Sequence, residues 1–458
     1  MLKCISPVDG RVYAERPTAS LEAAKAAIAA ARTAQARWRA VPLDARIALV
    51  RKGVEALVAH RDAAAEELAW MMGRPARFGG EFGGVTERAT YMAEIAPKAL
   101  APLVIEESSA FRRSIAREPH GVVFVIAPWN YPYLTAINTI VPALIAGNAV
   151  LIKPATQTLL SGERMVAGFL EAGLPEGLFQ NLFLDHPTTN ALIAARAFDF
   201  INFTGSVGGG RAIEQAAAGT FTPLGLELGG KDPAYVMEDA DLDAAVASLM
   251  DGAFYNSGQC CCGIERVYVA PALYDAFVEK SVAEVEKLKL GNPLDPETTL
   301  GPMASPRFAA EVRAQTGEAL AAGAKALINP GLFPADDGGA YLAPQILVDV
   351  THAMRVMRDE SFGPVVGIMK AENDAEALRL MNDSEFGLTV SLWTRDPERA
   401  ARLGAQLETG TVFMNRCDYL DPAVCWTGCK NTGRGATLSE LGYHSLTRPK
   451  SYHFRMPS

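Results

Sequence analysis

The chain has 458 residues, of which 49% are hydrophobic and 21% charged, a composition typical of a globular protein too long for one hydrophobic core. Its 52 Asp and Glu residues outnumber its 43 Lys and Arg residues, and the resulting net charge of −9 argues against a nucleic-acid partner. The sequence contains no uninterrupted apolar segment of membrane-spanning length and no signal-peptide pattern, so we expect a cytoplasmic protein with no membrane partner.

The first half of the chain predicts helices followed by alternating strands and helices. Apolar residues at three- and four-residue steps predict helices over residues 18–40 and 43–72. Short apolar runs predict buried strands, with helices between them, at 122–127, 148–153, 178–184, 198–203 and 225–228. This alternation is typical of a parallel sheet.

Four unusual residues lie near the ends of these predicted strands, namely Asn130, Lys153, Gly205 and Glu227. In open parallel sheets, ligands bind at the carboxyl ends of the strands. The placement of these residues therefore predicts a binding site at that edge of the sheet.

The second half predicts another α/β lobe. A capped amphipathic helix over residues 239–256 leads into three consecutive cysteines. Further strands are predicted at 265–269, 341–348, 365–369, 389–393 and 411–415, and helices at 271–288, 305–322, 373–381 and 396–405. Residues 451–455 predict an edge strand.

The seven cysteines, an odd number in a chain of this length, do not resemble a disulfide framework, so we expect free thiols in a reducing compartment. Three adjacent thiols are a poor arrangement for a tetrahedral metal site, and no metal is expected. In this run, Cys261 follows a glycine-containing turn whose backbone N–H groups favour an anion. The alternative is that Cys260, Cys261 and Cys262 are small buried hydrophobic residues.

Two further residues have side chains suited to catalysis. Glu227 is flanked by leucines and lies two residues before a pair of glycines, which favours a partly buried carboxylate with a raised pKa, suited to a general base. The alternative is an ordinary surface Glu on a turn. Asn130 lies between two prolines, and its amide could donate to a developing oxyanion. An Asn in an ordinary turn is the alternative.

A glycine-rich turn at residues 203–210 ends a predicted strand and opens a helix, as in phosphate-binding loops, although its glycines lack the usual dinucleotide-binding order. Lys153 ends the preceding strand, where it could reach a ribose or a phosphate. The alternative is a solvated lysine.

Taken together, the motifs resemble those of the aldehyde dehydrogenase superfamily, in the family's order and over nearly the whole chain. The motifs are PWNYP (128–132), LIKPATQT (151–158), FTGS (203–206), LELGGK (226–231), GQCCCG (258–263), ESFGPV (360–365), GTVFMN (410–415) and GCKNTGRG (428–435). The resemblance implies an α/β fold with a Rossmann-type NAD(P)-binding domain (1–105 and 122–229), a catalytic domain (230–425) and a small β oligomerisation extension (106–121 and 441–458). It also implies a homodimer or homotetramer.

The resemblance implies that Cys261 is the nucleophile, Glu227 the base that activates the deacylating water, and Asn130 part of the oxyanion hole. Lys231 is expected to help position the base. The resemblance or its departures place a further set of residues at the cofactor: Trp129, Lys153, Thr156, Gly205, Ser206, Gly210, Glu360 and Phe362. Thr156 stands where NAD-preferring members often carry a Glu that repels a 2′-phosphate, so we expect the cofactor to be NAD or NADP.

By the same resemblance, the substrate tunnel is lined by Tyr131, Thr135, Asn138, Cys260, Cys262, Asp418, Tyr419 and Trp426. The amide and hydroxyl groups predict a polar tunnel, with no Arg or Lys on its helix to bind a carboxylate. Asp418 and Asp421 could attract a cationic aminoaldehyde or could simply be solvated acids. We therefore expect a small polar aldehyde, a semialdehyde or an aminoaldehyde. Two other functions compete, a CoA-acylating dehydrogenase and a non-catalytic binding protein on the same fold.

Overall fold

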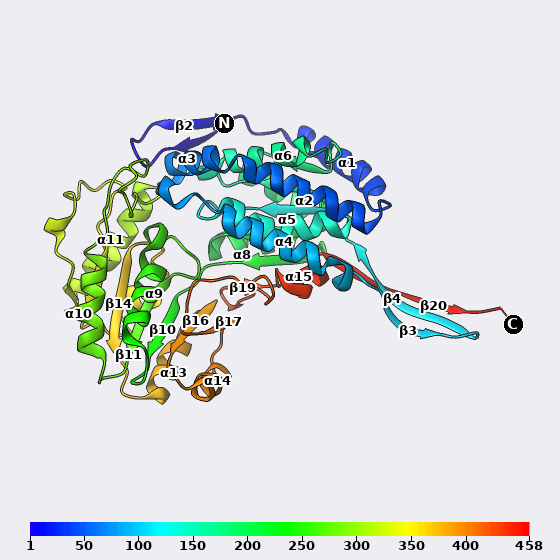
Figure 1. The fold of residues 1–458 in the computed structure, drawn as a ribbon. Coiled ribbons are helices and arrows are strands. Elements are labelled where there is room, and N and C mark those ends of the chain that lie inside the picture. Colours follow the sequence, from blue (N-terminus) through cyan, green and yellow to red (C-terminus); the bar gives the residue numbers. More distant parts are fainter. Residues whose placement is uncertain (458) are drawn as a thin grey trace.

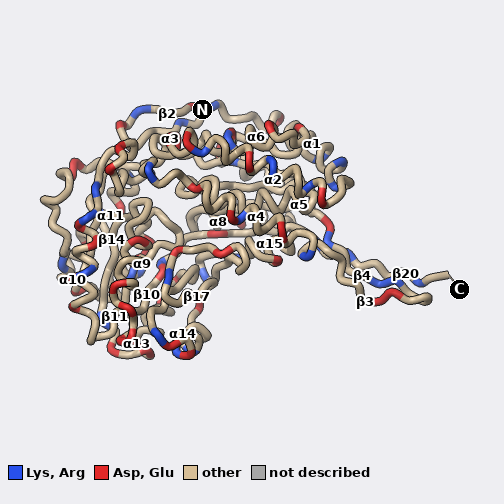
Figure 2. The backbone as a smooth tube through the Cα atoms, viewed as in Figure 1, with Lys and Arg blue, Asp and Glu red and all other residues tan. Residues whose placement is uncertain are grey.

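The computed structural model describes residues 1–457, which form two α/β lobes and a three-stranded extension that projects from the first lobe (Figure 1). Ser458, the last residue of the predicted extension, lies outside the described residues. Among the helices of residues 1–457, none has both the length and the apolar character needed to cross a membrane. Acidic and basic residues are interspersed along the helices of both lobes (Figure 2).

The first lobe is built on a six-stranded sheet that is parallel except for one edge strand. In spatial order its strands are β7 (Phe179–Asn181), β6 (Ala149–Lys153), β5 (Val122–Ile126), β8 (Phe200–Thr204), β9 (Leu224–Glu227) and the antiparallel β19 (Gly433–Arg434). Every residue of β5 and β6 is buried, as expected of strands with helices on both faces. The strand order reverses between β5 and β8, which places a crevice at their carboxyl ends.

Nine helices and a small hairpin surround this sheet. They are α1 (Leu21–Trp38), α2 (Leu43–Ala59), α3 (Arg61–Met72), α4 (Phe82–Ala99), α5 (Pro132–Ala146), α6 (Leu160–Glu171), α7 (His186–Ala194), α8 (Val207–Ala217), α15 (Ser439–Ser445), β1 (Leu2–Ile5) and β2 (Val12–Arg16), with short turns η1 (Ala76–Phe78) and η2 (Thr156–Thr158). The prediction of one helix over residues 43–72 is wrong, because the chain turns at His60. The backbone of His60 leaves the helical region (φ −96°, ψ 13°), and its N–H donates to the carbonyls of Leu57 and Val58.

The second lobe has a seven-stranded sheet, again parallel except for one edge strand. In spatial order its strands are the antiparallel β12 (Lys325–Ala326), β13 (Gln345–Val348), β14 (Val365–Lys370), β11 (Ile264–Val269), β10 (Asp232–Val236), β16 (Thr389–Trp393) and β17 (Thr411–Met414). The strand predicted to start at residue 341 starts only at Gln345. Pro344 precedes it and has no N–H to donate to a neighbouring strand.

Helices cover both faces of the second sheet. They are α9 (Leu242–Phe254), α10 (Tyr274–Val285), α11 (Pro306–Ala321), α12 (Arg355–Arg358), α13 (Asp374–Asn382) and α14 (Pro397–Gly404), with turns η3 (Tyr255–Gly258) and η4 (Pro330–Leu332) and a separate pair β15 (Phe386–Gly387) and β18 (Cys429–Lys430). Alternate residues of β11 point to opposite faces, so Tyr268 packs with α11 to α14, whereas Val267 and Val269 pack with α9 and α10.

The extension is an antiparallel sheet of β3 (Leu103–Glu107), β4 (Phe111–Pro119) and β20 (Thr447–Arg455), with β4 in the middle. The predicted edge strand is therefore confirmed. Residues 441–445, also assigned to the extension by the sequence, instead belong to α15, which packs on α4 and α5. The end of the chain thus returns to the first lobe, where it supplies β19, α15 and the strand that pairs with β4.

Candidate active site between the two lobes

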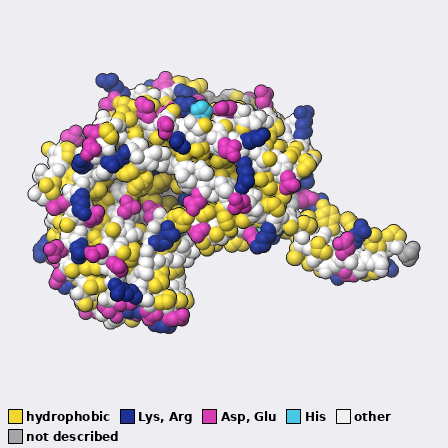
Figure 3. Space-filling model, in the orientation of Figure 1, with side chains coloured by type: hydrophobic (Ala, Val, Ile, Leu, Met, Phe, Trp, Pro, Cys, Tyr) yellow, Lys and Arg dark blue, Asp and Glu magenta, His cyan; other side chains and the backbone are white. Residues whose placement is uncertain are grey.

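A cavity of about 800 Å³ lies between the lobes, where the space-filling view shows a hollow (Figure 3). The carboxyl ends of the first sheet form one wall, and the segments just before β10, β11 and β14 form the opposite wall. The cavity brings together nearly all predicted site residues: Trp129, Asn130, Tyr131, Thr135, Asn138, Lys153, Thr156, Gly205, Ser206, Glu227, Cys260, Cys261, Cys262, Glu360, Phe362, Asp418, Tyr419 and Trp426.

Gly210 is the predicted site residue that does not line the cavity. It is buried in the first turns of α8, where a Cβ atom would overlap the side chain of Leu228. Its role in the fold is therefore close packing of α8 against the segment that follows β9, rather than contact with a ligand.

Cys261 is presented by a loop that depends on unusual backbone angles. Residues 256–258 have φ values of 53°, 57° and 69°, in the left-handed region. A Cβ atom at Gly258 would overlap the carbonyl of Gly363, so this turn requires glycine. The Gln259 side chain closes the turn, because its Nε2 donates to the Asn256 carbonyl at 3.0 Å and its Oε1 accepts from the N–H of Ala304 at 2.8 Å.

The three adjacent thiols have different surroundings. Cys260 and Cys262 are buried, with their sulfur atoms 3.5 Å apart, and they donate to Asp418 Oδ1 at 3.3 and 2.9 Å. Cys261 is the more exposed of the three. The neighbouring thiols of Cys260 and Cys262 lower the pKa of Cys261 to about 6, whereas the interaction with Cys261 raises the pKa of Cys260 to about 12. Cys261 is therefore the thiol suited to act as a thiolate at neutral pH.

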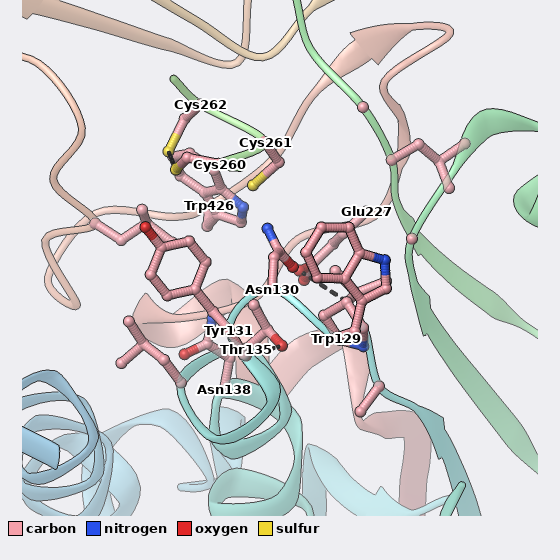
Figure 4. A pocket seen from close by; sticks show the side chains of 18 of the residues that line it. Trp129, Asn130, Tyr131, Thr135, Asn138, Glu227, Cys260, Cys261, Cys262 and Trp426 are labelled. Atoms are coloured by element: carbon pink, nitrogen blue, oxygen red, sulfur yellow. Dashed lines mark hydrogen bonds between the residues drawn. The ribbon is translucent and has the colours of Figure 1, made fainter. Parts of the chain in front are cut away.

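Asn130 faces Cys261 from the other lobe. It precedes α5, and its amide nitrogen points toward the Cys261 sulfur (Figure 4). Its Nδ2 donates to the carbonyl of Gln259 at 3.2 Å. An amide nitrogen carries two N–H donors. The second donor is available to an oxygen atom beside the sulfur.

A buried ion pair, which sequence reasoning missed, fixes the position of Asn130. Arg74 Nη1 lies 2.9 Å from Glu81 Oε1, and both side chains are 1% exposed. Arg74 also donates to the Asn130 carbonyl and, at 3.2 Å, to Asn256 Oδ1. Glu81 accepts the N–H groups at the start of α5. The pair thus connects α5 to the cysteine loop. Opposite charges seven residues apart give no sequence signal that distinguishes them from a surface pair.

Glu227 lies at the end of β9 and is held by two hydroxyl groups. Its Oε1 accepts from Thr437 at 2.8 Å and its Oε2 accepts from Thr204 at 3.3 Å. Burial raises the pKa of Glu227, and the two hydrogen bonds lower it. Thr437 lies 210 residues further along the chain, so no local pattern indicates this contact.

Lys231 does not contact Glu227, contrary to expectation. Its Nζ lies 2.6 Å from Glu265 Oε2 and donates to Ser361 Oγ at 3.0 Å. Glu265 in turn accepts the backbone N–H groups of Ser361 and Phe362 at 2.7 and 2.8 Å. Lys231 therefore supports the loop that carries Phe362, on the second lobe.

The groups suited to a dinucleotide lie mainly along the first-lobe wall, and Glu360 faces them from the second lobe. Ser206 caps α8 by accepting from the N–H of Gly209 at 3.2 Å, and a Cβ atom at Gly208 would meet open space. Such an open helix start suits a diphosphate. Lys153 is buried beside it, and desolvation lowers its pKa. Glu360 accepts from the N–H of Gly230 at 2.9 Å, and burial raises its pKa to about 8. These donors and acceptors fit phosphate oxygens and ribose hydroxyls.

Trp129 contributes an aromatic ring, and not a polar contact, to the wall of the cavity. Its ring stacks on Phe308, with centroids 5.1 Å apart, and meets the edge of Phe362 at 5.5 Å. Phe308 was not predicted from the sequence, because it lies on α11 with no motif around it.

The substrate end is less polar than predicted. Thr135 donates to the carbonyl of Tyr131 at 2.8 Å, and Asn138 Oδ1 accepts from Arg88 at 3.2 Å, so the hydroxyl and the amide oxygen are engaged within the protein, whereas Asn138 Nδ2 has no acceptor among the described residues. Aromatic and aliphatic side chains supply much of the wall: Phe78, Tyr131, Leu134, Tyr255, Leu420 and Trp426. Arg88 was missed, because only α5 was considered for a basic residue and Arg88 lies on α4.

Asp418 is held by the thiols rather than facing the cavity as a free anion. Burial raises its pKa well above the ordinary range for a carboxyl group, and Asp421 is exposed outside. Because two thiols donate to Asp418 Oδ1, this side chain does not favour a cationic aminoaldehyde.

Comparisons with known proteins give a consistent result. Residues 1–452 match the model of the family described as "Aldehyde dehydrogenase family". The chain is 37% identical to the 4,4'-diapolycopene aldehyde oxidase of Methylomonas sp, over 98% of this chain and 85% of that protein. It is 33% identical to the NAD(P)+ succinate semialdehyde dehydrogenase of Escherichia coli (strain K12), over 96% and 95% of the two chains. The crystal structure of NADP-dependent glyceraldehyde-3-phosphate dehydrogenase from Bacillus halodurans C-125, complexed with NADP, superposes with a TM-score of 0.93 at 33% identity, covering 99% of this chain and 96% of that one.

Proposed function

Because the chain belongs to the aldehyde dehydrogenase family, we propose that it oxidises an aldehyde to a carboxylic acid through a thioester on Cys261, with NAD or NADP as the electron acceptor. The observation that carries this proposal is the meeting of Cys261 and Asn130 across the lobes, with Glu227 in the same cavity. Each of the three supplies a group that the reaction needs.

In the first half of the reaction, the Cys261 thiolate attacks the aldehyde carbon. The free N–H of Asn130 Nδ2 and the backbone N–H of Cys261 hold the developing oxyanion. A bound nicotinamide would supply the acceptor for the hydride of this carbon, which then remains on the Cys261 sulfur as a thioester. Lys153 and Ser206 on the first-lobe wall, with Glu360 on the opposite wall, would hold the cofactor.

In the second half, Glu227 takes a proton from a water molecule as that water attacks the thioester. The C–S bond breaks, the acid leaves and the thiolate is restored. Burial supports this role, because it raises the pKa of Glu227 and so strengthens it as a base. A resident general base also favours hydrolysis over transfer of the acyl group to CoA, the competing function on this fold.

Replacing the base tests this assignment. Glu227→Gln should still form NAD(P)H in a single-turnover burst but lose steady turnover by about 10²–10⁴-fold. Cys261→Ser, the control, should lose the burst as well. An unchanged kcat in Glu227→Gln would reject the role of Glu227.

We further propose a small polar aldehyde as the substrate. The names of the two relatives give different aldehydes, so we infer the class of substrate from the residues that line the cavity. The amide of Asn138 and the guanidinium of Arg88 support a polar substrate at the far end from Cys261, whereas the surrounding aromatic side chains limit its size. A kcat/KM series over succinic semialdehyde, 4-aminobutanal, betaine aldehyde and hexanal tests this, and a clear preference for hexanal would reject it.

We also propose that the extension joins subunits in a homodimer or homotetramer. Leu103, Val104, Ile105 and Phe454 of its sheet are each more than half exposed, an apolar surface that association would cover. Sedimentation analysis of the chain and of a Val104→Asp variant tests this proposal.

A further inference from the structure

Arg88 is a buried cation at the substrate end of the cavity. It lies on α4, is 5% exposed and lines the cavity together with Asn138, which is 1% exposed. Its Nη1 donates to the carbonyl of Leu134 at 3.1 Å and to Asn138 Oδ1 at 3.2 Å. Both of these acceptors are neutral, so neither compensates the charge.

Two donors at this place have no acceptor within residues 1–457. They are the Nε of Arg88 and the Nδ2 of Asn138. Buried donors in proteins nearly always have a partner, and one left without a partner costs about 1–3 kcal/mol. A pair of adjacent buried donors, one of them charged, is the arrangement that an anionic oxygen of a ligand would satisfy.

A second buried arginine gives the contrast. The Arg74 guanidinium pairs with Glu81 and donates to two further oxygens, so its charge is fully compensated inside the protein. For Arg88 the nearest acidic groups act only at longer range, and burial lowers its pKa. Arg88 lines the same cavity as Cys261 and Glu227, and the aromatic side chains around it limit the length of the substrate.

We propose that Arg88, with the amide of Asn138, binds a carboxylate at the far end of a short aldehyde. This inference rests on the proposed function and narrows its substrate class from polar aldehydes to aldehydes with an anionic end. A guanidinium offers parallel N–H donors that match the two oxygens of a carboxylate. Asp418 Oδ1 already accepts from the thiols of Cys260 and Cys262, which disfavours the alternative of a cationic substrate end.

Substrates matched in chain length test the proposal. The wild-type protein should use succinic semialdehyde at least tenfold better than butanal, measured as kcat/KM. Arg88→Met keeps the length of the side chain but removes the charge, and it should lower kcat/KM for succinic semialdehyde 10- to 100-fold more than for butanal, mainly through KM. Arg88→Lys, which keeps the charge, should recover part of the loss.

The outcomes separate the proposal from its premise. Equal losses of kcat/KM with both substrates in Arg88→Met would mean that Arg88 only holds α4 against α5. A preference of the wild-type protein for butanal or 4-aminobutanal over succinic semialdehyde would also overturn the inference. A preference for glyceraldehyde 3-phosphate over succinic semialdehyde would replace the carboxylate by a phosphate and overturn the assignment. No NAD(P)H with any aldehyde would reject the proposed function itself, and the inference with it.

Discussion

The guanidinium of Arg74 donates a hydrogen bond to the backbone carbonyl of Asn130, 56 residues further along the chain. Asn130 therefore does not depend on its own loop for its position. It is held by Arg74, whose charge is balanced by Glu81. The same guanidinium also donates to Asn256, in the loop that carries Cys261. One buried cation thus sets the distance between the amide and the sulfur on opposite lobes.

Removing that cation should destabilise the protein. Arg74→Met leaves the Glu81 carboxylate buried without a partner, which costs about 3–5 kcal/mol. Chemical denaturation measures the loss, and Arg74→Met combined with Glu81→Met should recover most of it. The control is Arg51→Met, because the exposed pair of Arg51 with Glu94 contributes about 0–1 kcal/mol. Equal effects at the two arginines would contradict the buried role of Arg74.

The thiol of Cys261 should react as a thiolate at neutral pH. Its pKa is lowered to about 6, against about 8.5 for an ordinary cysteine. Because the thiolate forms above the pKa, inactivation by iodoacetamide should speed up as the pH rises through about 6 and then level off. The Cys261→Ser variant should show no such phase. A midpoint near 8.5 would show that the neighbouring thiols do not stabilise the thiolate.

Loss of the Thr437 hydroxyl should shift the pH dependence of turnover. Its hydrogen bond to Glu227 favours the carboxylate and lowers the pKa, so Thr437→Val raises the pKa. A base acts above its pKa, so the acid limb of the kcat profile should move to higher pH. At neutral pH the loss should be up to about tenfold, the worth of one hydrogen bond. Thr437→Ser keeps the hydroxyl and should behave as wild type; matching profiles for Val and Ser would exclude this role.

A methyl group at Gly258 should disrupt the cysteine loop. The residue has φ +69°, and its Cβ would overlap the carbonyl of Gly363, so Gly258→Ala should lower kcat by more than tenfold. In contrast, Gly317 on α11 has open space around it, and Gly317→Ala should stabilise the protein by about 1 kcal/mol. Steady-state kinetics and thermal unfolding distinguish the two variants. Normal activity in Gly258→Ala would contradict the required turn.

The protein should turn over with both NAD and NADP. Thr156 lines the cavity on η2 and carries no charge to repel a 2′-phosphate. Thr156→Glu should lower kcat/KM for NADP at least tenfold relative to NAD, about 1.4 kcal/mol of repulsion. Thr156→Ser should leave the ratio unchanged. The absence of turnover with NADP at millimolar concentration in the wild-type protein would contradict this prediction.

Local patterns of the sequence predicted the parts of the structure that depend on neighbouring residues. The buried runs at residues 122–127 and 148–153 became β5 and β6, and Cys261, Glu227 and Asn130 each lie in a short motif that the fold brings to one cavity. Strand ends are reliable guides because a parallel sheet aligns them at one edge.

The residues missed by the sequence are those whose partners are distant. Arg88 meets Asn138 from 50 residues away, and Thr437 meets Glu227 from 210 residues away. On a helix, Arg88 looks like a solvated charge, because periodicity does not show what covers its face. The direction of the Thr135 hydroxyl was not predictable for the same reason, since it donates to the Tyr131 carbonyl. Residue type predicts the chemistry of a side chain, but packing decides which way it points.

The return of the chain's end to the first lobe also sets the order in which the protein can mature during synthesis. The strand that pairs with β9, the threonine that holds Glu227 and the strand that pairs with β4 all come from residues 433–455. Most of the first lobe is translated early. The edge of its sheet at β9 stays unpaired until these residues have been translated. Glu227 therefore gains its hydrogen bond from Thr437 only after these residues have been translated, so a chain terminated before them carries the nucleophile but lacks the group that fixes Glu227.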